Sequence, residues 1–72
     1  MREGSALQIL EAVFSALSER GYDPVAQLAG YLLSGDPTYI TAHRNARSLV
    51  QRHDRADLLA ELLREYVGNL KI

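Results

Sequence analysis

The feature that most restricts how this chain can fold is one continuous segment, GYDPVAQLAGYLLSGDPTYITAHRNAR, which occupies residues 21–47. It contains both prolines of the chain, each directly after an aspartate, and three of the five glycines. Glycine commonly ends a helix, aspartate caps the next one, and proline is favoured in its first turn. This order occurs twice, as Gly21-Tyr22-Asp23-Pro24 and as Gly35-Asp36-Pro37. The segment therefore predicts short helices in close succession.

The first half of the chain is patterned as two amphipathic helices. Ser5, with Gln8 three residues later, has the pattern of a capping box that starts the first helix. The inward stripe of that helix is Leu7, Leu10, Val13, Phe14 and Leu17. Asp23 is expected to cap the second helix, whose inward residues are Val25, Leu28, Ala29 and Leu32. Because no charged residue lies between Pro24 and Ser34, we expect the second helix at the centre of the core.

The remainder of the chain predicts three more helical elements. Asp36 begins a short turn that contains Tyr39 and Ile40. Thr41 is expected to cap a fourth helix that continues to about His53, with Ala46, Leu49 and Val50 inward. Asp54 opens a fifth helix, ended by Gly68, with the apolar stripe Leu58, Leu59, Leu62, Leu63 and Tyr66. Since no alternating strand pattern occurs, the prediction is an all-α fold, a compact bundle of about five short helices.

Size and composition narrow the class of protein. The 72 residues form a single domain, residues 1–72, without cysteine crosslinks, and 47% of them are apolar. Short helices with more apolar surface than one thin bundle can bury commonly pair with a second copy, so we expect a homodimer. A net charge of −1 gives no general attraction to nucleic acid or membranes. Without an apolar run of ~20 residues or a secretory signal, no membrane partner and a cytoplasmic location are expected.

The residues that could support catalysis are few. An enzyme needs a nucleophile with a base, a carboxylate pair in a pocket, or a metal cluster. His53, Asp54 and Asp57 could be read as metal ligands, but carboxylates at this position are more simply explained as helix-capping residues. We therefore predict a protein that is not an enzyme and that uses neither a metal nor another cofactor.

A basic segment from His43 to Arg55 suggests an alternative function. Its four arginines are half of the chain's lysine and arginine residues. The basic residues are, in order, His43, Arg44, Arg47, Arg52, His53 and Arg55. Two short helices with such a face resemble a helix-turn-helix and could bind nucleic acid. The interpretation we favour is a solvated helix face that pairs with glutamate and aspartate side chains across a dimer, since DNA binding is strongly electrostatic and the chain is nearly neutral.

Three tyrosines, Tyr22, Tyr31 and Tyr39, fall within the central segment, residues 21–47. Their simplest interpretation is a set of half-buried rings at helix ends, with hydroxyls that reach backbone or aspartate oxygens. A binding role for these rings is the competing interpretation.

The amino-acid sequence of the central segment, residues 21–47, resembles the signature of the IreB family of small bacterial regulatory proteins. The matching residues are Gly21, Tyr22, Pro24 and Gln27, then Gly30 to Pro37, then Tyr39 to Thr41, His43, Ala46 and Arg47. The flanking helices are also similar, and the resemblance covers about residues 9–67.

This resemblance implies a fold and a function. It implies an intertwined, helix-turn-helix-like homodimer, and a cytoplasmic regulator that binds other proteins downstream of a membrane Ser/Thr kinase, in cell-envelope stress and cephalosporin resistance. The partner would be that kinase or a component of its pathway. Family members carry phosphorylated threonines on an N-terminal arm, and Met1–Gly4 contains no hydroxyl residue, so the phosphorylation site here is unknown. Candidate partner-surface residues are Tyr22, Asp23, Pro24, Tyr31, Gly35, Asp36, Pro37, Tyr39, His43, Arg44, Arg47 and Arg55.

Overall fold

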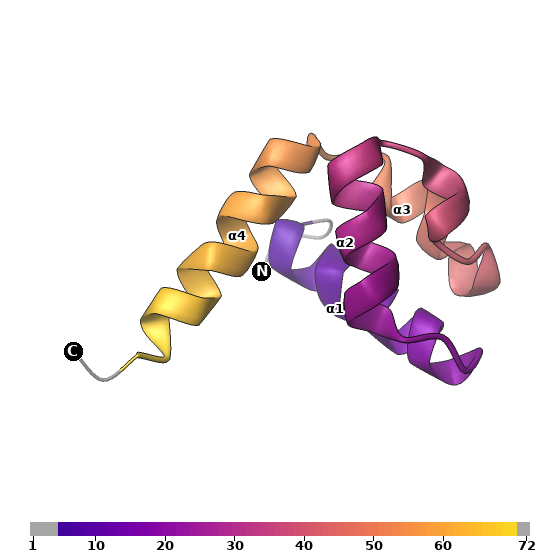
Figure 1. Cartoon of the computed structure of the whole chain (residues 1–72), viewed down its shortest axis with the longest axis horizontal. Coiled ribbons are helices and arrows are strands. Elements are labelled where there is room, and N and C mark those ends of the chain that lie inside the picture. The colour runs from indigo at the N-terminus through magenta and orange to yellow at the C-terminus, as the bar shows by residue number, and fades with distance from the viewer. Residues whose placement is uncertain (1–4, 71–72) are drawn as a thin grey trace.

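The computed structural model describes residues 5–70, and within that range it contains four α-helices and two 3₁₀ turns. The helices are α1 (Ala6–Glu19), α2 (Pro24–Ser34), α3 (Ala46–Val50) and α4 (Arg55–Gly68), and the turns are η1 (Pro37–Tyr39) and η2 (His43–Asn45). The all-α prediction is confirmed, while the expectations about Met1–Gly4 lie outside the described residues. Figure 1 shows α1, α2 and α3 packed together, with the C-terminal half of α4 projecting away from them.

The predicted starts of the first two helices are confirmed by their capping hydrogen bonds. The Ser5 side chain accepts a hydrogen bond from the backbone N–H of Gln8 at 3.3 Å. Oδ1 of Asp23 accepts from the N–H groups of Val25 and Ala26 at 3.1 and 3.2 Å. These side chains satisfy N–H groups that the first turn of a helix leaves without a partner.

The centre of the core is α1, and the prediction that α2 occupies this place is wrong. Helix α1 contacts α2, α3 and α4, and five of its residues are buried: Ile9, Leu10, Val13, Ala16 and Leu17. In α2, Leu28 and Tyr31 are buried, whereas Val25 is 71% and Leu33 87% exposed. A lack of charged residues is compatible with burial but does not require it, because apolar surface can also lie open in a single chain.

The predicted fourth helix is interrupted. Arg44 and Asn45 have left-handed backbone angles, with φ of 54° and 63°, so the segment divides into η2 and a short α3. The Thr41 hydroxyl does accept from the N–H of His43 at 3.1 Å, as a cap would. Left-handed geometry ends a helix because it rotates the next peptide out of hydrogen-bonding register. The bundle has four α-helices instead of about five, because the predicted third element, begun by Asp36, is the 3₁₀ turn η1.

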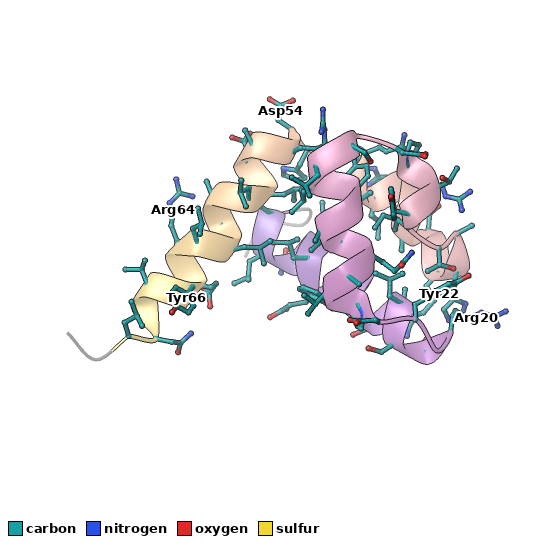
Figure 2. All side chains as sticks on the ribbon, in the orientation of Figure 1. Arg20, Tyr22, Asp54, Arg64 and Tyr66 are labelled. Atoms are coloured by element: carbon teal, nitrogen blue, oxygen red, sulfur yellow. The ribbon has the colours of Figure 1, made fainter. Side chains whose placement is uncertain are left out.

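Helix α4 begins after Asp54 as predicted, with Asp57 in its first turn, but most of its predicted stripe is exposed. Leu58 is buried and Leu62 packs against the core, while Leu59, Leu63 and Tyr66 are exposed. Figure 2 shows Tyr66 and Arg64 on opposite sides of the projecting half of this helix. The core contacts of α4 are thus concentrated in its first two turns.

Within residues 5–70, every helix is too short or too polar to cross a lipid bilayer.

Candidate functional site

The link between α2 and η1 is built by residues of the central segment. The side-chain amide of Gln27 donates to the carbonyl oxygen of Tyr39 at 2.9 Å. The Tyr39 ring lies against Gly30 so closely that a Cβ on this residue would collide with it. Gly30 therefore permits this close packing, since a larger side chain at this position would force the Tyr39 ring to shift.

The turn between α2 and η1 is closed by short side chains. The Ser34 hydroxyl donates to the carbonyl oxygen of Gly30 at 2.7 Å and accepts from the N–H of Asp36 at 3.0 Å. Oδ1 of Asp36 in turn accepts from the N–H of Thr38 at 3.0 Å and from its hydroxyl at 2.7 Å. Hydrogen bonds from Thr38, together with the positive charge of Arg47, lower the pKa of Asp36.

Two of the predicted partner-surface arginines are bound to backbone carbonyls. Arg47 donates from Nε to the carbonyl oxygen of Ile40 at 2.8 Å. Arg55 donates from Nη1 to the carbonyl oxygen of Leu32 at 2.9 Å, and its guanidinium lies over Gly35. Arginines in such positions stabilise helix ends and loops, so these two residues form part of the scaffold.

The other two basic residues of the predicted surface converge on one carboxylate. Nε2 of His43 lies 2.8 Å from Oε1 of Glu19, and Nη1 of Arg44 lies 2.7 Å from Oε2 of the same residue. The hydrogen bond from His43 and the charge of Arg44 lower the pKa of Glu19. Sequence analysis did not select Glu19 and missed this cluster. Because the partners are 24 and 25 residues apart, no local pattern predicts it.

The tyrosines differ in environment. Tyr22 is 50% and Tyr39 is 39% exposed, in keeping with rings near helix ends. Tyr31 lies inside α2 and is 5% exposed, so the prediction of a half-buried ring at a helix end is wrong for it. Tyr31 is a core residue. Figure 2 shows Tyr22 beside Arg20 at the end of the molecule opposite Tyr66.

An apolar groove of about 510 Å³ lies between α2 and α4. Its lining comes from α1, α2 and α4: Phe14, Val25, Leu28, Ala29, Leu32, Leu33, Leu59 and Leu62. None of these residues was among the predicted partner-surface residues. The signal that could have found the groove is the charge-free sequence of α2, which was read as buried core.

No group of three or more histidine, cysteine, aspartate or glutamate side chains within residues 5–70 is arranged to hold a metal ion. Asp54 lies at the start of α4 with an extended backbone, and Asp57 lies in its first turn, where the partial positive charge of the helix favours a carboxylate.

Comparison with known proteins assigns the chain to a family. The model of a protein family described as IreB regulatory phosphoprotein matches residues 1–68. The chain belongs to the IreB family. This confirms the resemblance seen in the central segment, and it extends over nearly the whole chain.

Two relatives of this IreB-family protein illustrate the similarity. A UPF0297 protein of Ruminiclostridium cellulolyticum is 53% identical over 68 residues, which cover 94% of this chain and 77% of the relative. A UPF0297 protein of Lachnoclostridium phytofermentans is 52% identical over 61 residues, which cover 85% of this chain and 69% of the relative. Membership of the IreB family implies a regulatory rather than a catalytic role, and its description as a phosphoprotein family implies that a kinase acts on its members.

Proposed function

We propose that this protein is a non-enzymatic regulator that acts by binding other proteins, and that it does so as a homodimer. The observation that carries the proposal is the apolar groove between α2 and α4, together with the exposed apolar face of α4. Soluble proteins rarely leave a continuous apolar surface of this kind uncovered, so it indicates an interface.

A second copy is the occupant that fits this surface best. The groove is lined by apolar side chains, and α2 carries no charged residue that would favour an oppositely charged partner. In α4, Leu59, Leu63 and Tyr66 follow one another at spacings of four and three residues, which is the spacing of a helix face that packs against another helix. A projecting α4 that packs on the partner's groove gives an intertwined, isologous dimer.

The regulatory role follows from the family. We place the protein in the cytoplasm, downstream of a membrane Ser/Thr kinase that responds to cell-envelope stress, as the family resemblance implies. The dimer would leave its outer, polar surface for a component of that pathway. Phosphorylation would change the charge of this surface, and charge changes alter protein binding through new ion pairs or repulsion.

Sedimentation equilibrium from low to high micromolar concentration tests the dimer. We expect the wild type to have twice the monomer mass of 8.0 kDa. Leu33→Glu places a charge on the groove without touching the core, because Leu33 is 87% exposed, and should give a monomer. Ser48→Glu, at an exposed position of α3, is the matched control and should stay dimeric. A wild type that stays monomeric at high concentration would refute the dimer.

Phosphorylation of the purified protein by the Ser/Thr kinase of the same cell tests the regulatory role. We expect incorporation of phosphate, located by mass spectrometry, and a change in affinity for the pathway component that binds the unmodified protein. A phosphorylated protein with unchanged affinity would contradict regulation by surface charge.

The alternative function, a nucleic-acid interface from His43 to Arg55, has less support. Arg47 and Arg55, two of the four arginines of this segment, are bound to backbone carbonyls. Phosphate contacts require positive groups that can turn toward the backbone of the nucleic acid. Retention on heparin at low salt would revive this alternative.

A further inference from the structure

The backbone break before α3 places two neighbouring side chains on the same partner. In a continuous helix, consecutive residues point about 100° apart and do not face a common group. Here the left-handed angles of Arg44 and Asn45 turn the chain so that His43 and Arg44 reach one carboxylate. Left-handed non-glycine residues persist only where the surrounding structure holds them, and they are concentrated at binding sites.

The geometry of the cluster suits an oxyanion. One donor meets each carboxylate oxygen of Glu19, at 2.8 Å from His43 and 2.7 Å from Arg44. Two donors on two oxygens of one group is the arrangement by which arginine-containing sites recognise carboxylates and phosphates. Glu19 therefore occupies the position that the oxygens of an external anion would take.

The resident carboxylate is exchangeable. The side chains of Glu19 and Arg44 are 45% and 62% exposed. Ion pairs in such positions contribute little to stability because water screens them and side-chain freedom is lost. Beside the cluster lies a polar pocket of about 370 Å³, lined by Gln8, Glu11, Ala12, Ser15 and Arg44. Its volume gives room for an incoming group, although the negative charge of Glu11 lowers the affinity of an anion there.

We propose that His43 and Arg44 form an anion-binding site for the phosphate group of a phosphorylated serine or threonine, and that Glu19 occupies this site when no phosphate is bound. A phosphate dianion carries more charge and more acceptor oxygens than a carboxylate, so it competes well for the two donors. The class of ligand rests on the proposed regulatory function, whereas the site itself rests on the cluster. Docking of a phosphorylated segment would release Glu19 and with it the contact between α1 and η2.

The ¹⁵N-labelled full chain can be titrated with inorganic phosphate and with N-acetyl-phosphothreonine amide while amide and His43 ring signals are followed by NMR. If Glu19 closes the site about nine-tenths of the time, it lowers the apparent affinity about tenfold, so Glu19→Gln should raise the affinity by about that factor. The double variant Glu19→Gln/Arg44→Gln should lose the response. Glu65→Gln, on α4, is the control and should titrate like the wild type.

Equal phosphate affinity in the wild type and in Glu19→Gln, or a response that persists in the double variant, would overturn the proposal. A response to inorganic phosphate without one to the phosphothreonine amide would overturn the assigned ligand. If Glu19→Gln does not fold, as judged by circular dichroism, the wild type is compared with Arg44→Gln, which should bind less phosphate. Sedimentation of the same samples tests the dimer independently of phosphate binding, because Glu19 lies outside the groove.

Discussion

Arg55 donates from Nη1 to the carbonyl oxygen of Leu32 at 2.9 Å, so the first residue of α4 is tied to the last turn of α2. This bond satisfies a carbonyl that the end of α2 leaves without a helical partner. It also sets the separation of the two helices that border the apolar groove.

Loss of this tie should weaken the fold. We expect Arg55→Ala to lower the free energy of unfolding by about 1 kcal/mol, as for the loss of a charge-assisted hydrogen bond at a partly solvated site. Urea unfolding measures the change, and Arg52→Ala, another exposed arginine, is the control. Equal losses in the two variants would show that the bond to Leu32 has no special role.

The packing of Tyr39 can be tested by substituting Gly30, with Gly68 as the control position. A Cβ at Gly30 collides with the Tyr39 ring, so Gly30→Ala should destabilise the protein by about 1–3 kcal/mol. Nothing lies within 4 Å of a Cβ at Gly68, and Gly68→Ala should stabilise the last turn of α4 by about 0.5–1 kcal/mol. Thermal unfolding of both variants gives the comparison. If Gly30→Ala stabilised the protein instead, the Tyr39 ring could not lie against Gly30.

Leu58 and Leu63 separate the core of one chain from the proposed interface. Leu58 is fully buried, and Leu58→Ala should destabilise the fold by about 2–5 kcal/mol at every protein concentration. Leu63 is 55% exposed in the single chain, so Leu63→Ala should raise the dimer dissociation constant. It should leave the free energy of unfolding of the monomer nearly unchanged. Denaturant unfolding at several protein concentrations distinguishes the two effects. A Leu63→Ala variant with unchanged dimer dissociation would exclude that face of α4 from the interface.

Acid should destabilise the protein through Glu19 and Asp36. Their pKa values lie below the ordinary 4.5 and 3.8, because His43 and Thr38 respectively donate hydrogen bonds to the carboxylates. The unfolded chain therefore binds these protons more readily than the folded one. The stabilisation is complete above the ordinary values and is lost as the pH falls through the lowered ones. Unfolding free energies measured from pH 7 to pH 3 should fall, and should fall less steeply in Glu19→Gln. If the unfolding free energy fell with the same slope in the wild type and in Glu19→Gln, Glu19 would not contribute to the acid sensitivity.

Structural features that depend on residues close in sequence were the ones predicted correctly. The caps at Ser5, Asp23 and Asp36 were predicted because each side chain bonds an N–H two or three residues away. The left-handed Asn45 also had a local signal, since asparagine adopts this conformation more readily than most residues, but helical spacing on either side outweighed it.

The partners of the basic surface residues were not predicted. His43, Arg44, Arg47 and Arg55 were selected as surface residues, yet two of them bind backbone carbonyls and two bind Glu19. Those partners are between 7 and 25 residues away along the chain. The pairings arise from the packing of separate elements, so spacing alone carries no information on them.

The amino-acid sequence by itself determined the helical class, the starts of α1, α2 and α4, and the family, because capping and periodicity act over a few residues and the central segment is distinctive. Tertiary structure alone decided which helix lies at the centre. Both α1 and α2 have apolar faces, and α1 became the core because it contacts the three other helices, which left Val25 and Leu33 of α2 at the surface. The physical reason is that burial depends on which surfaces the other elements cover, and this is a property of the whole packing arrangement rather than of any one segment.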